Sequence, residues 1–243
     1  MKNKKRNAIF EYAEAFGVAL IAALILRMLV VQAFRIPTGS MKDTLLVGDF
    51  LLVNKFVYGA KTPERIPLVD IKLPSYRFPA FKEPKRGQII VFKYPLDESL
   101  DYIKRCIGVP GDTIEIKGSN VFVNGEPEGE KNLIAKNQFD PVEGFYIDYY
   151  RIINNNGAEY TIRVHSNKNA RQQNYGPVAV PPDHLFMLGD NRDNSQDSRY
   201  WGFMPMENIV GEAMVIYWSW DKYVPLWDLS EKIRWNRIFN IIR

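Results

Sequence analysis

Two residues of this 243-residue chain, Ser40 and Lys104, are of types that together catalyse acyl transfer. Ser40 stands in the segment RIPTGSM at 35–41, and Lys104 stands in YIKRC at 102–106. A serine hydroxyl is a weak nucleophile until a base removes its proton, and a lysine is such a base only where its surroundings lower its pKa. We therefore interpret Ser40 as a nucleophile and Lys104 as its base.

This interpretation makes a demand on the surroundings of the amine. Lowering the lysine pKa from about 10.4 toward about 8 corresponds to about 3 kcal/mol of desolvation and local field. The apolar neighbours Tyr102, Ile103 and Ile107 suit that demand. Each residue also has a structural alternative, because serine often caps a helix end and lysine often stands on an edge strand that must not pair further.

Other catalytic chemistries have weaker support in the sequence. The single cysteine, Cys106, excludes an intramolecular disulfide, and we interpret it as a packing residue. The two histidines, His165 and His184, come without an HExxH motif or a CxxC pair, so we expect no metal and no cofactor. We expect His184 to make a structural hydrogen bond, which leaves a Ser/His/Asp mechanism as the weaker alternative.

The composition indicates a folded chain with one substantial core, or a core with a smaller subdomain, because 46% of the residues are apolar and 13% are aromatic. The net charge of +4 is modest, and most basic residues are scattered. No basic stripe interleaves with aromatic residues, so we expect no nucleic acid partner.

Residues 1–34 predict a basic cytoplasmic start followed by one transmembrane helix. The run at 15–26 is apolar or glycine, and after Arg27 the apolar residues continue to 31, which together approach the about 17–25 residues that a bilayer requires. The basic cluster at 2–6 places the amino terminus in the cytoplasm and the rest of the chain on the other face. A cleavable signal peptide is the alternative, and Glu11, Glu14 and Arg27 weigh against it.

After Ser40 the sequence predicts a mainly β fold, an antiparallel catalytic domain with an inserted smaller β subdomain. Short runs rich in β-branched and aromatic residues are separated by Gly, Pro and Asn, and Asn124-Gly125 is typical of a hairpin turn. These runs lie at 50–59, 87–95, 112–126 and 212–220. We assign 35–126 and 181–225 to the catalytic core and the polar, Asn-rich stretch 127–180 to the inserted subdomain.

Two other segments have a distinct character. The stretch 62–86 contains five prolines, Pro63, Pro67, Pro74, Pro79 and Pro84, and should be an extended excursion. The segment 226–243 predicts an amphipathic C-terminal helix, which either rests on an anionic membrane surface or packs onto its own domain. Its expected apolar face consists of Trp235, Ile238, Phe239 and Ile242.

A polar block, LGDNRDNSQDSRYWGF at 188–203, is flanked by aromatic residues and is interpreted as a folded turn in which Ser195 orients a neighbouring amine. With this block the chain resembles the type I signal peptidases, the membrane-bound serine endopeptidases that remove signal peptides from exported preproteins. The family's boxes occur in order as IPTGSM at 36–41, GDFLLVNKF at 48–56, RGQIIVF and YIKRCIGVPGD within 86–112, and GDNRDNSQDSRYWG at 189–202.

The resemblance implies a role for each matching residue. Ser40 would be the nucleophile, Lys104 the general base and Ser195 the residue that holds the amine, while Thr38 and the Ser40 backbone N–H would form the oxyanion hole. Asp197 and Arg199 would form a supporting salt bridge. The residues around the substrate's −1 side chain would be Ile36, Met41, Leu45, Tyr102 and Ile103, with Phe34 and Leu51 near the −3 side chain.

The chain departs from the family at two places. Many Gram-negative members read Met-x-Pro-Thr after the nucleophile, whereas this chain has Met41-Lys42-Asp43-Thr44, which puts the local turn in doubt. Thr38 stands where many members have serine, and it keeps the hydroxyl.

The resemblance also implies partners and a location: preprotein signal peptides with small residues at −3 and −1, the lipid bilayer, the secretion translocon, and a single-pass protein in the inner cell membrane. Two alternatives stay open. One is a self-cleaving Ser/Lys protease of the repressor type, against which the anchor counts. The other is a catalytically silent membrane-tethered scaffold, which would be expected to lack Ser40, Lys104 or Ser195.

Overall fold

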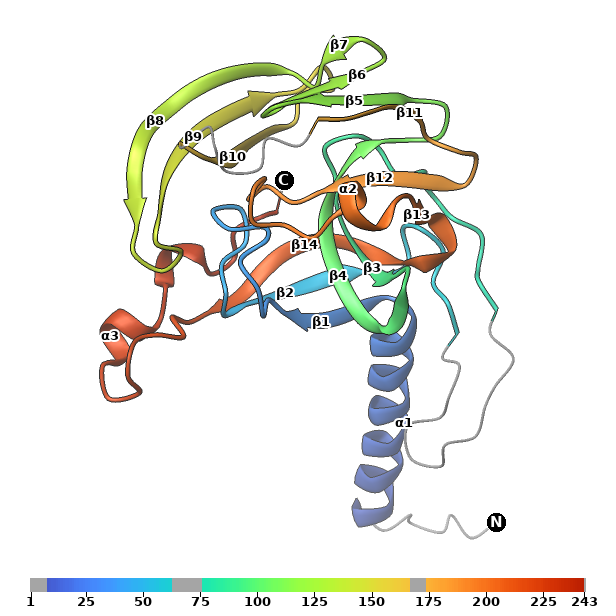
Figure 1. Cartoon of the computed structure of the whole chain (residues 1–243). Coiled ribbons are helices and arrows are strands. Elements are labelled where there is room, and N and C mark those ends of the chain that lie inside the picture. The colour runs from blue at the N-terminus through green and yellow to red at the C-terminus, as the bar shows by residue number, and fades with distance from the viewer. Residues whose placement is uncertain (1–7, 63–75, 167–173, 243) are drawn as a thin grey trace, which may run out of the picture.

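A computed structural model describes residues 8–62, 76–166 and 174–242 of the chain. Its described part is mainly antiparallel β-sheet, with one long helix at the amino-terminal end (Figure 1). The mainly β fold expected from the sequence is therefore confirmed. Of the proline-rich stretch, 63–75 lies outside the described residues, as does the basic cluster at 2–6.

The helix α1 spans Ala8–Leu29 and leads into the first strand; Figure 1 shows it extending away from the sheets. In the described part of the chain, no helix is long and apolar enough to cross a membrane.

The largest sheet holds seven strands in the order β1-β2-β14-β3-β4-β12-β13. Their bounds are Val31–Arg35 (β1), Asp49–Asn54 (β2), Ile89–Tyr94 (β3), Asp97–Gly108 (β4), His184–Leu188 (β12), Met204–Pro205 (β13) and Ile209–Ser219 (β14). The short helices α2, Ser198–Trp201, and η1, Met206–Asn208, lie between its last strands.

Both faces of this sheet are covered, which explains the uninterrupted apolar run in β3. Ile89 and Val91 belong to one buried cluster, and Ile90 and Phe92 belong to another. Because successive side chains of a strand point to opposite faces, a strand that is buried on both sides needs an apolar residue at each position.

Two smaller sheets complete the fold. One has the order β11-β5-β6-β7 and the other the order β10-β9-β8. Their strands are Thr113–Lys117 (β5), Asn120–Val123 (β6), Glu126–Pro127 (β7), Glu130–Asp140 (β8), Phe145–Ile153 (β9), Glu159–His165 (β10) and Tyr175–Ala179 (β11). The turn expected at Asn124-Gly125 is confirmed, since both residues have the positive φ, 56° and 83°, of such a hairpin.

The predicted boundaries of the inserted subdomain are wrong. The stretch 127–180 supplies the three-stranded sheet, but it also supplies β11, which pairs with β5 from the stretch assigned to the catalytic core. Ile114 and Ile116 of β5 pack with Phe186 and Leu188 of β12, so the four-stranded sheet is joined to the large sheet through a common cluster. Pairing between distant segments decided this boundary, and composition carries no signal for it.

The predicted C-terminal helix is also wrong. The described residues of the segment, 226–242, contain only two short helices, the single turn α3, Leu229–Lys232, and η2, Trp235–Arg237. It then runs beside β14, where Phe239 N–H donates to the Ile216 carbonyl and Ile242 N–H to the Met214 carbonyl.

Charged residues on this segment have partners that a continuous helix would not give them. Arg237 bonds to the fully buried Asp49 at 2.6 Å, and Lys232 Nζ donates to the carbonyl of Asp221. Ile242 packs against the core, whereas Trp235 and Phe239 stay exposed.

Candidate active site

Ser40 and Lys104 meet in the folded chain. Lys104 Nζ lies 2.7 Å from Ser40 Oγ and also donates to the carbonyl of Ile103 at 3.0 Å. Only 4% of Lys104 is exposed, so the contact is shielded from bulk water. A neutral amine in this position has a lone pair within reach of the serine proton.

The register of the large sheet places the lysine. Lys104 stands opposite Ile90 of β3, and its other neighbour, β12, pairs with β4 only as far as Leu188 opposite Arg105. Beyond that pair β12 leaves β4 and the chain turns into the polar block. Lys104 is therefore at the point where one edge of β4 becomes free. The loop 36–48 between β1 and β2, which carries Ser40 and is here called the nucleophile loop, reaches Lys104 there.

Burial sets the protonation of the amine. Desolvation lowers the pKa of Lys104 to about 8, although the carboxylates of Asp197 and Asp190 oppose this by favouring the charged form. The lowering demanded by the sequence interpretation is therefore present. The ring of Tyr102, 5.2 Å from Nζ, is part of the enclosing wall.

The expected hydrogen bond from Ser195 to the lysine amine is absent from the described structure. Ser195 is buried, and its Oγ has no hydrogen-bond partner. It nevertheless lies beside the nucleophile, because a Cβ on Gly189 would collide both with Ser195 Oγ and with the Ser40 carbonyl oxygen. Gly189 thus allows the polar block to approach the nucleophile loop, a role that sequence reasoning missed although the residue opens the block.

The expected salt bridge between Asp197 and Arg199 is present. Arg199 Nε and Nη2 each lie 2.8 Å from an Asp197 carboxylate oxygen, and Asp197 is fully buried. The same carboxylate accepts the Gly189 N–H and caps α2. The pair therefore connects the short helix to the turn that carries Ser195.

A second buried ion pair was not foreseen. Arg105, next to Lys104, contacts Asp190 through Nε at 2.8 Å and Nη2 at 2.7 Å, and neither side chain is more than 1% exposed. Thr44 Oγ1 donates to the same carboxylate at 2.6 Å. An arginine within an apolar strand was the available signal. The pair ties β4, the polar block and the nucleophile loop together.

Most of the expected pocket residues gather in one cluster. Ile36, Met41, Leu45 and Leu51 are at most 3% exposed, and Phe34 and Ile103 pack against them. Tyr102 is the exception, since it packs with the cluster on the other face and stacks on Tyr94 at 4.4 Å between ring centroids.

Two hydrogen-bond donors beside the nucleophile are free. Thr38 is exposed, and neither its hydroxyl nor the Ser40 backbone N–H bonds to another group in the described part of the chain. Donors of this kind next to a nucleophile are available to a developing oxyanion.

The competing residues have structural partners, as the sequence analysis expected. His184 Nδ1 lies 2.7 Å from the Pro182 carbonyl. Cys106 is fully buried, and burial raises the pKa of its thiol to about 12. Within the described residues, no three His, Cys, Asp or Glu side chains are grouped as metal ligands.

Comparison with known proteins decides the family. The model of the family described as "Signal peptidase, peptidase S26" matches residues 9–218. The chain is 40% identical over 230 residues to signal peptidase I of Pseudomonas fluorescens, covering 90% of this chain and 76% of the relative. It is 37% identical over 229 residues to signal peptidase I of Aquifex aeolicus, covering 82% and 80%. The chain belongs to the signal peptidase I family.

Family membership confirms the resemblance seen in the sequence. Over most of its length this chain is a signal peptidase I, a serine peptidase that removes signal peptides from preproteins. Matching relatives include signal peptidase I of Pseudomonas aeruginosa, 40% identical over 231 residues, covering 90% of this chain and 76% of that protein. The geometry around Ser40 and Lys104 is thus the candidate active site of this peptidase.

The pKa of Lys104 predicts the pH dependence of the enzyme. Only the neutral amine accepts a proton, so kcat/KM should rise about tenfold per pH unit below a pKa of about 8 and level off above it. The measurement is kcat/KM on one peptide substrate from pH 6 to 10, with circular dichroism at each pH to show that the fold is intact. An inflection near 6.5, the ordinary histidine value, would contradict a lysine base.

Proposed function

We propose that this signal peptidase cleaves preproteins with Ser40 as nucleophile and Lys104 as general base. The observation that carries the proposal is the 2.7 Å contact between Lys104 Nζ and Ser40 Oγ at a buried amine. Lys104 takes the hydroxyl proton while Ser40 Oγ bonds to the scissile carbonyl carbon. The resulting ammonium then returns its proton to the leaving amine as the C–N bond breaks.

The same amine serves the second half of the reaction. Once the cleaved chain has left, neutral Lys104 takes a proton from water, the hydroxide attacks the ester carbonyl, and the proton returns to Ser40 Oγ as the ester bond breaks. Thr38 Oγ1 and the Ser40 N–H are the proposed oxyanion donors, which their lack of other partners supports. Ser195, with its unpaired hydroxyl beside the nucleophile loop, is the proposed orienting residue.

The free edge of β4 is the proposed platform for the substrate. Residues 101–104 precede the stretch that pairs with β12, so an extended peptide can add to this edge through its backbone. Side chains of the −1 and −3 residues would then meet the cluster around Ile36 and Ile103, with Phe34 and Leu51 on the −3 side. Because this cluster is closely packed, small residues are the ones that fit.

The cleavage test uses a preprotein with alanine at −3 and −1 and the purified full chain in detergent. Ser40→Ala and Lys104→Ala should each lower the rate by about a thousandfold or more, and the double variant should be no slower, because nucleophile and base act as one unit. Ser99→Ala and Lys117→Ala, at exposed sites, serve as matched controls. Phenylalanine at −1 should stop processing. Substantial activity of Lys104→Ala would rule out the proposed base.

We further propose that residues 1–34, which include α1, anchor the enzyme in the lipid bilayer, with the basic residues at 2–6 in the cytoplasm and the β domain on the outer face near the translocon. Exposed apolar side chains on α1, among them Phe10, Phe16 and Leu20, support this proposal. Expressed in cells, the full chain should stay in the membrane pellet at alkaline pH, and protease added outside spheroplasts should digest the β domain. Recovery of the intact chain in the alkaline supernatant would contradict the anchor.

Thr38 offers a graded test of the oxyanion hole. Thr38→Ser keeps the hydroxyl and should cost little, whereas Thr38→Val keeps the shape and removes the donor. Loss of one such donor typically costs about 2.7–4 kcal/mol, or about a hundred- to thousandfold in kcat, with KM less affected. Single-turnover rates of the two variants measure this. A valine variant within about threefold of the wild type would show that backbone N–H groups suffice.

A further inference from the structure

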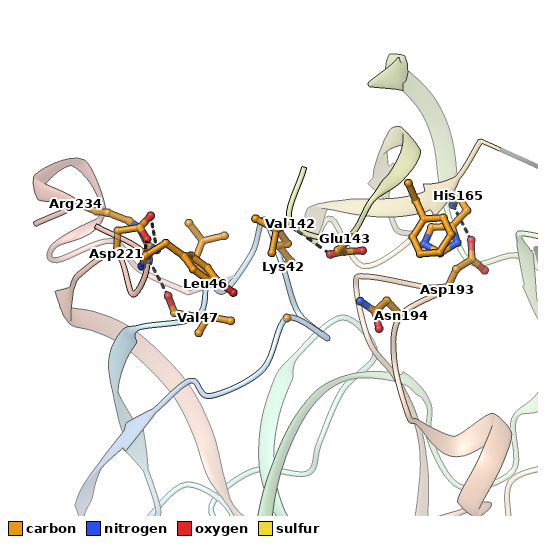
Figure 2. Close-up of a pocket in the computed structure, with 13 residues that line it drawn as sticks. Lys42, Leu46, Val47, Val142, Glu143, His165, Asp193, Asn194, Asp221 and Arg234 are labelled. Carbon is orange, nitrogen blue, oxygen red and sulfur yellow. Dashed lines mark hydrogen bonds and ion pairs between the residues drawn. The ribbon is translucent and has the colours of Figure 1, made fainter. Parts of the chain in front are cut away.

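A cleft with a volume of about 790 Å³ begins immediately beside the nucleophile. Gly39, the neighbour of Ser40, and Asn194, the neighbour of Ser195, both line it. Figure 2 shows Leu46, Val47, Asp221 and Arg234 on one side of this cleft and His165, Asp193 and Asn194 on the other, with Lys42 and Glu143 between them.

The nucleophile loop separates this cleft from the pocket proposed for the −1 and −3 residues. Met41 and Leu45 point into the buried cluster, whereas Lys42 and Leu46, each one residue further along the chain, line the cleft. None of the residues assigned to the −1 and −3 pocket lines it. A substrate that fills the pocket up to Ser40 must continue past the nucleophile, and the cleft is the open space that begins there.

The cleft has a fixed wall built from ion pairs. Lys42 contacts Asp140 and lies 3.4 Å from Glu143 in the turn between β8 and β9. Arg163 binds the same two carboxylates, and Asn191 Nδ2 bridges the Gly39 carbonyl at 3.1 Å and Glu143 Oε1 at 3.0 Å. Asp43, which lies 3.4 Å from Arg163, occupies the position at which this chain departs from the usual motif.

Two buried polar atoms of residues that line the cleft have no hydrogen-bond partner in the described structure. The Glu143 side chain is 9% exposed, and its Oε2 has no hydrogen-bond partner in the described structure. His165 Nε2 also lacks one. Buried polar atoms are nearly always bonded, so a carboxylate oxygen left without a donor at a cleft is a candidate ligand contact.

The charges of the lining residues favour donors over acceptors. Glu143, Asp193 and Asp221 are acidic, while the two cations, Lys42 and Arg234, already have carboxylate partners. An acidic peptide side chain entering the cleft would meet three carboxylates, whereas the two lining cations are already paired with Glu143 and Asp221. Peptide N–H groups and basic or neutral side chains would be accepted.

We propose that this cleft, here called the mature-side cleft, binds the first residues after the scissile bond and selects against acidic side chains at +1 to +3. The inference rests on the proposed function, because it takes Ser40 as the point where the substrate is cut. It assigns Glu143 as a specificity-determining residue rather than a catalytic one.

The test uses internally quenched peptides with alanine at −3 and −1 and with Gln, Lys or Glu at +1, +2 or +3, cleaved by the full chain in neutral detergent. Glu at one or more of these positions should lower kcat/KM about fivefold or more relative to Gln, and Lys should not. Added salt should shrink the difference. The Glu-to-Gln ratio is independent of how much enzyme is folded, so a purely structural change does not move it.

Glu143→Gln should reduce the logarithm of the Gln-to-Glu ratio of kcat/KM to about half of its wild-type value. Glu159 is an exposed carboxylate outside the cleft, so Glu159→Gln should leave this ratio at the wild-type value. If Glu143→Gln does not fold, Asp193→Asn, which removes another lining carboxylate, should reduce the same ratio, and the wild-type peptide series tests the selectivity by itself. Equal wild-type rates on the Gln, Lys and Glu peptides would overturn the mature-side cleft while leaving the peptidase intact. Failure to cleave any peptide would overturn the proposed function, and this inference with it.

Discussion

The candidate active site depends on one physical constraint: a lysine must be buried deeply enough to lose its proton near neutral pH and still lie against a serine. Lys104 meets it with 4% exposure and a pKa of about 8. The carboxylates of Asp190 and Asp197 act against this result, but each is committed to an arginine, Arg105 or Arg199. Desolvation therefore prevails over the local negative charge.

The sheet provides that burial at a place that a substrate can still reach. β4 pairs with β3 along residues 97–105 and with β12 along residues 105–108, so Lys104 precedes the stretch that pairs with β12. Arg105 is thus paired with β12, whereas Lys104, one residue earlier, lies on the unpaired edge of β4. Buried ion pairs are weak contributors to stability, yet removing one partner is costly, which suits them to hold loops in a single position. The pairs Lys42–Asp140 and Arg105–Asp190 join the nucleophile loop and the polar block to strands, and the pair Asp197–Arg199 links two parts of the polar block.

Some features were readable from the sequence because they depend on neighbours along the chain. The apolar run in β3 predicted a strand, and Asn124-Gly125 predicted the hairpin turn between β6 and β7, because strand periodicity and positive φ are local properties. The ion pair of Asp197 and Arg199 was expected from the family resemblance. The C-terminal helix failed for the opposite reason: Arg237 gains a buried partner in Asp49, from a distant segment, and this contact outweighs the helical pattern.

The sequence by itself determined the family and predicted the chemistry, since Ser40, Lys104 and the polar block carry a motif that is recognisable without coordinates. Only the tertiary structure decided that Ser195 Oγ is unpaired, that Arg105 neutralises Asp190, and that β11 joins β5 across the predicted domain boundary. It also decided that Lys42 and Glu143 stand together beside the nucleophile. These contacts join residues far apart in the chain, and their energies depend on burial and distance, which no local pattern encodes.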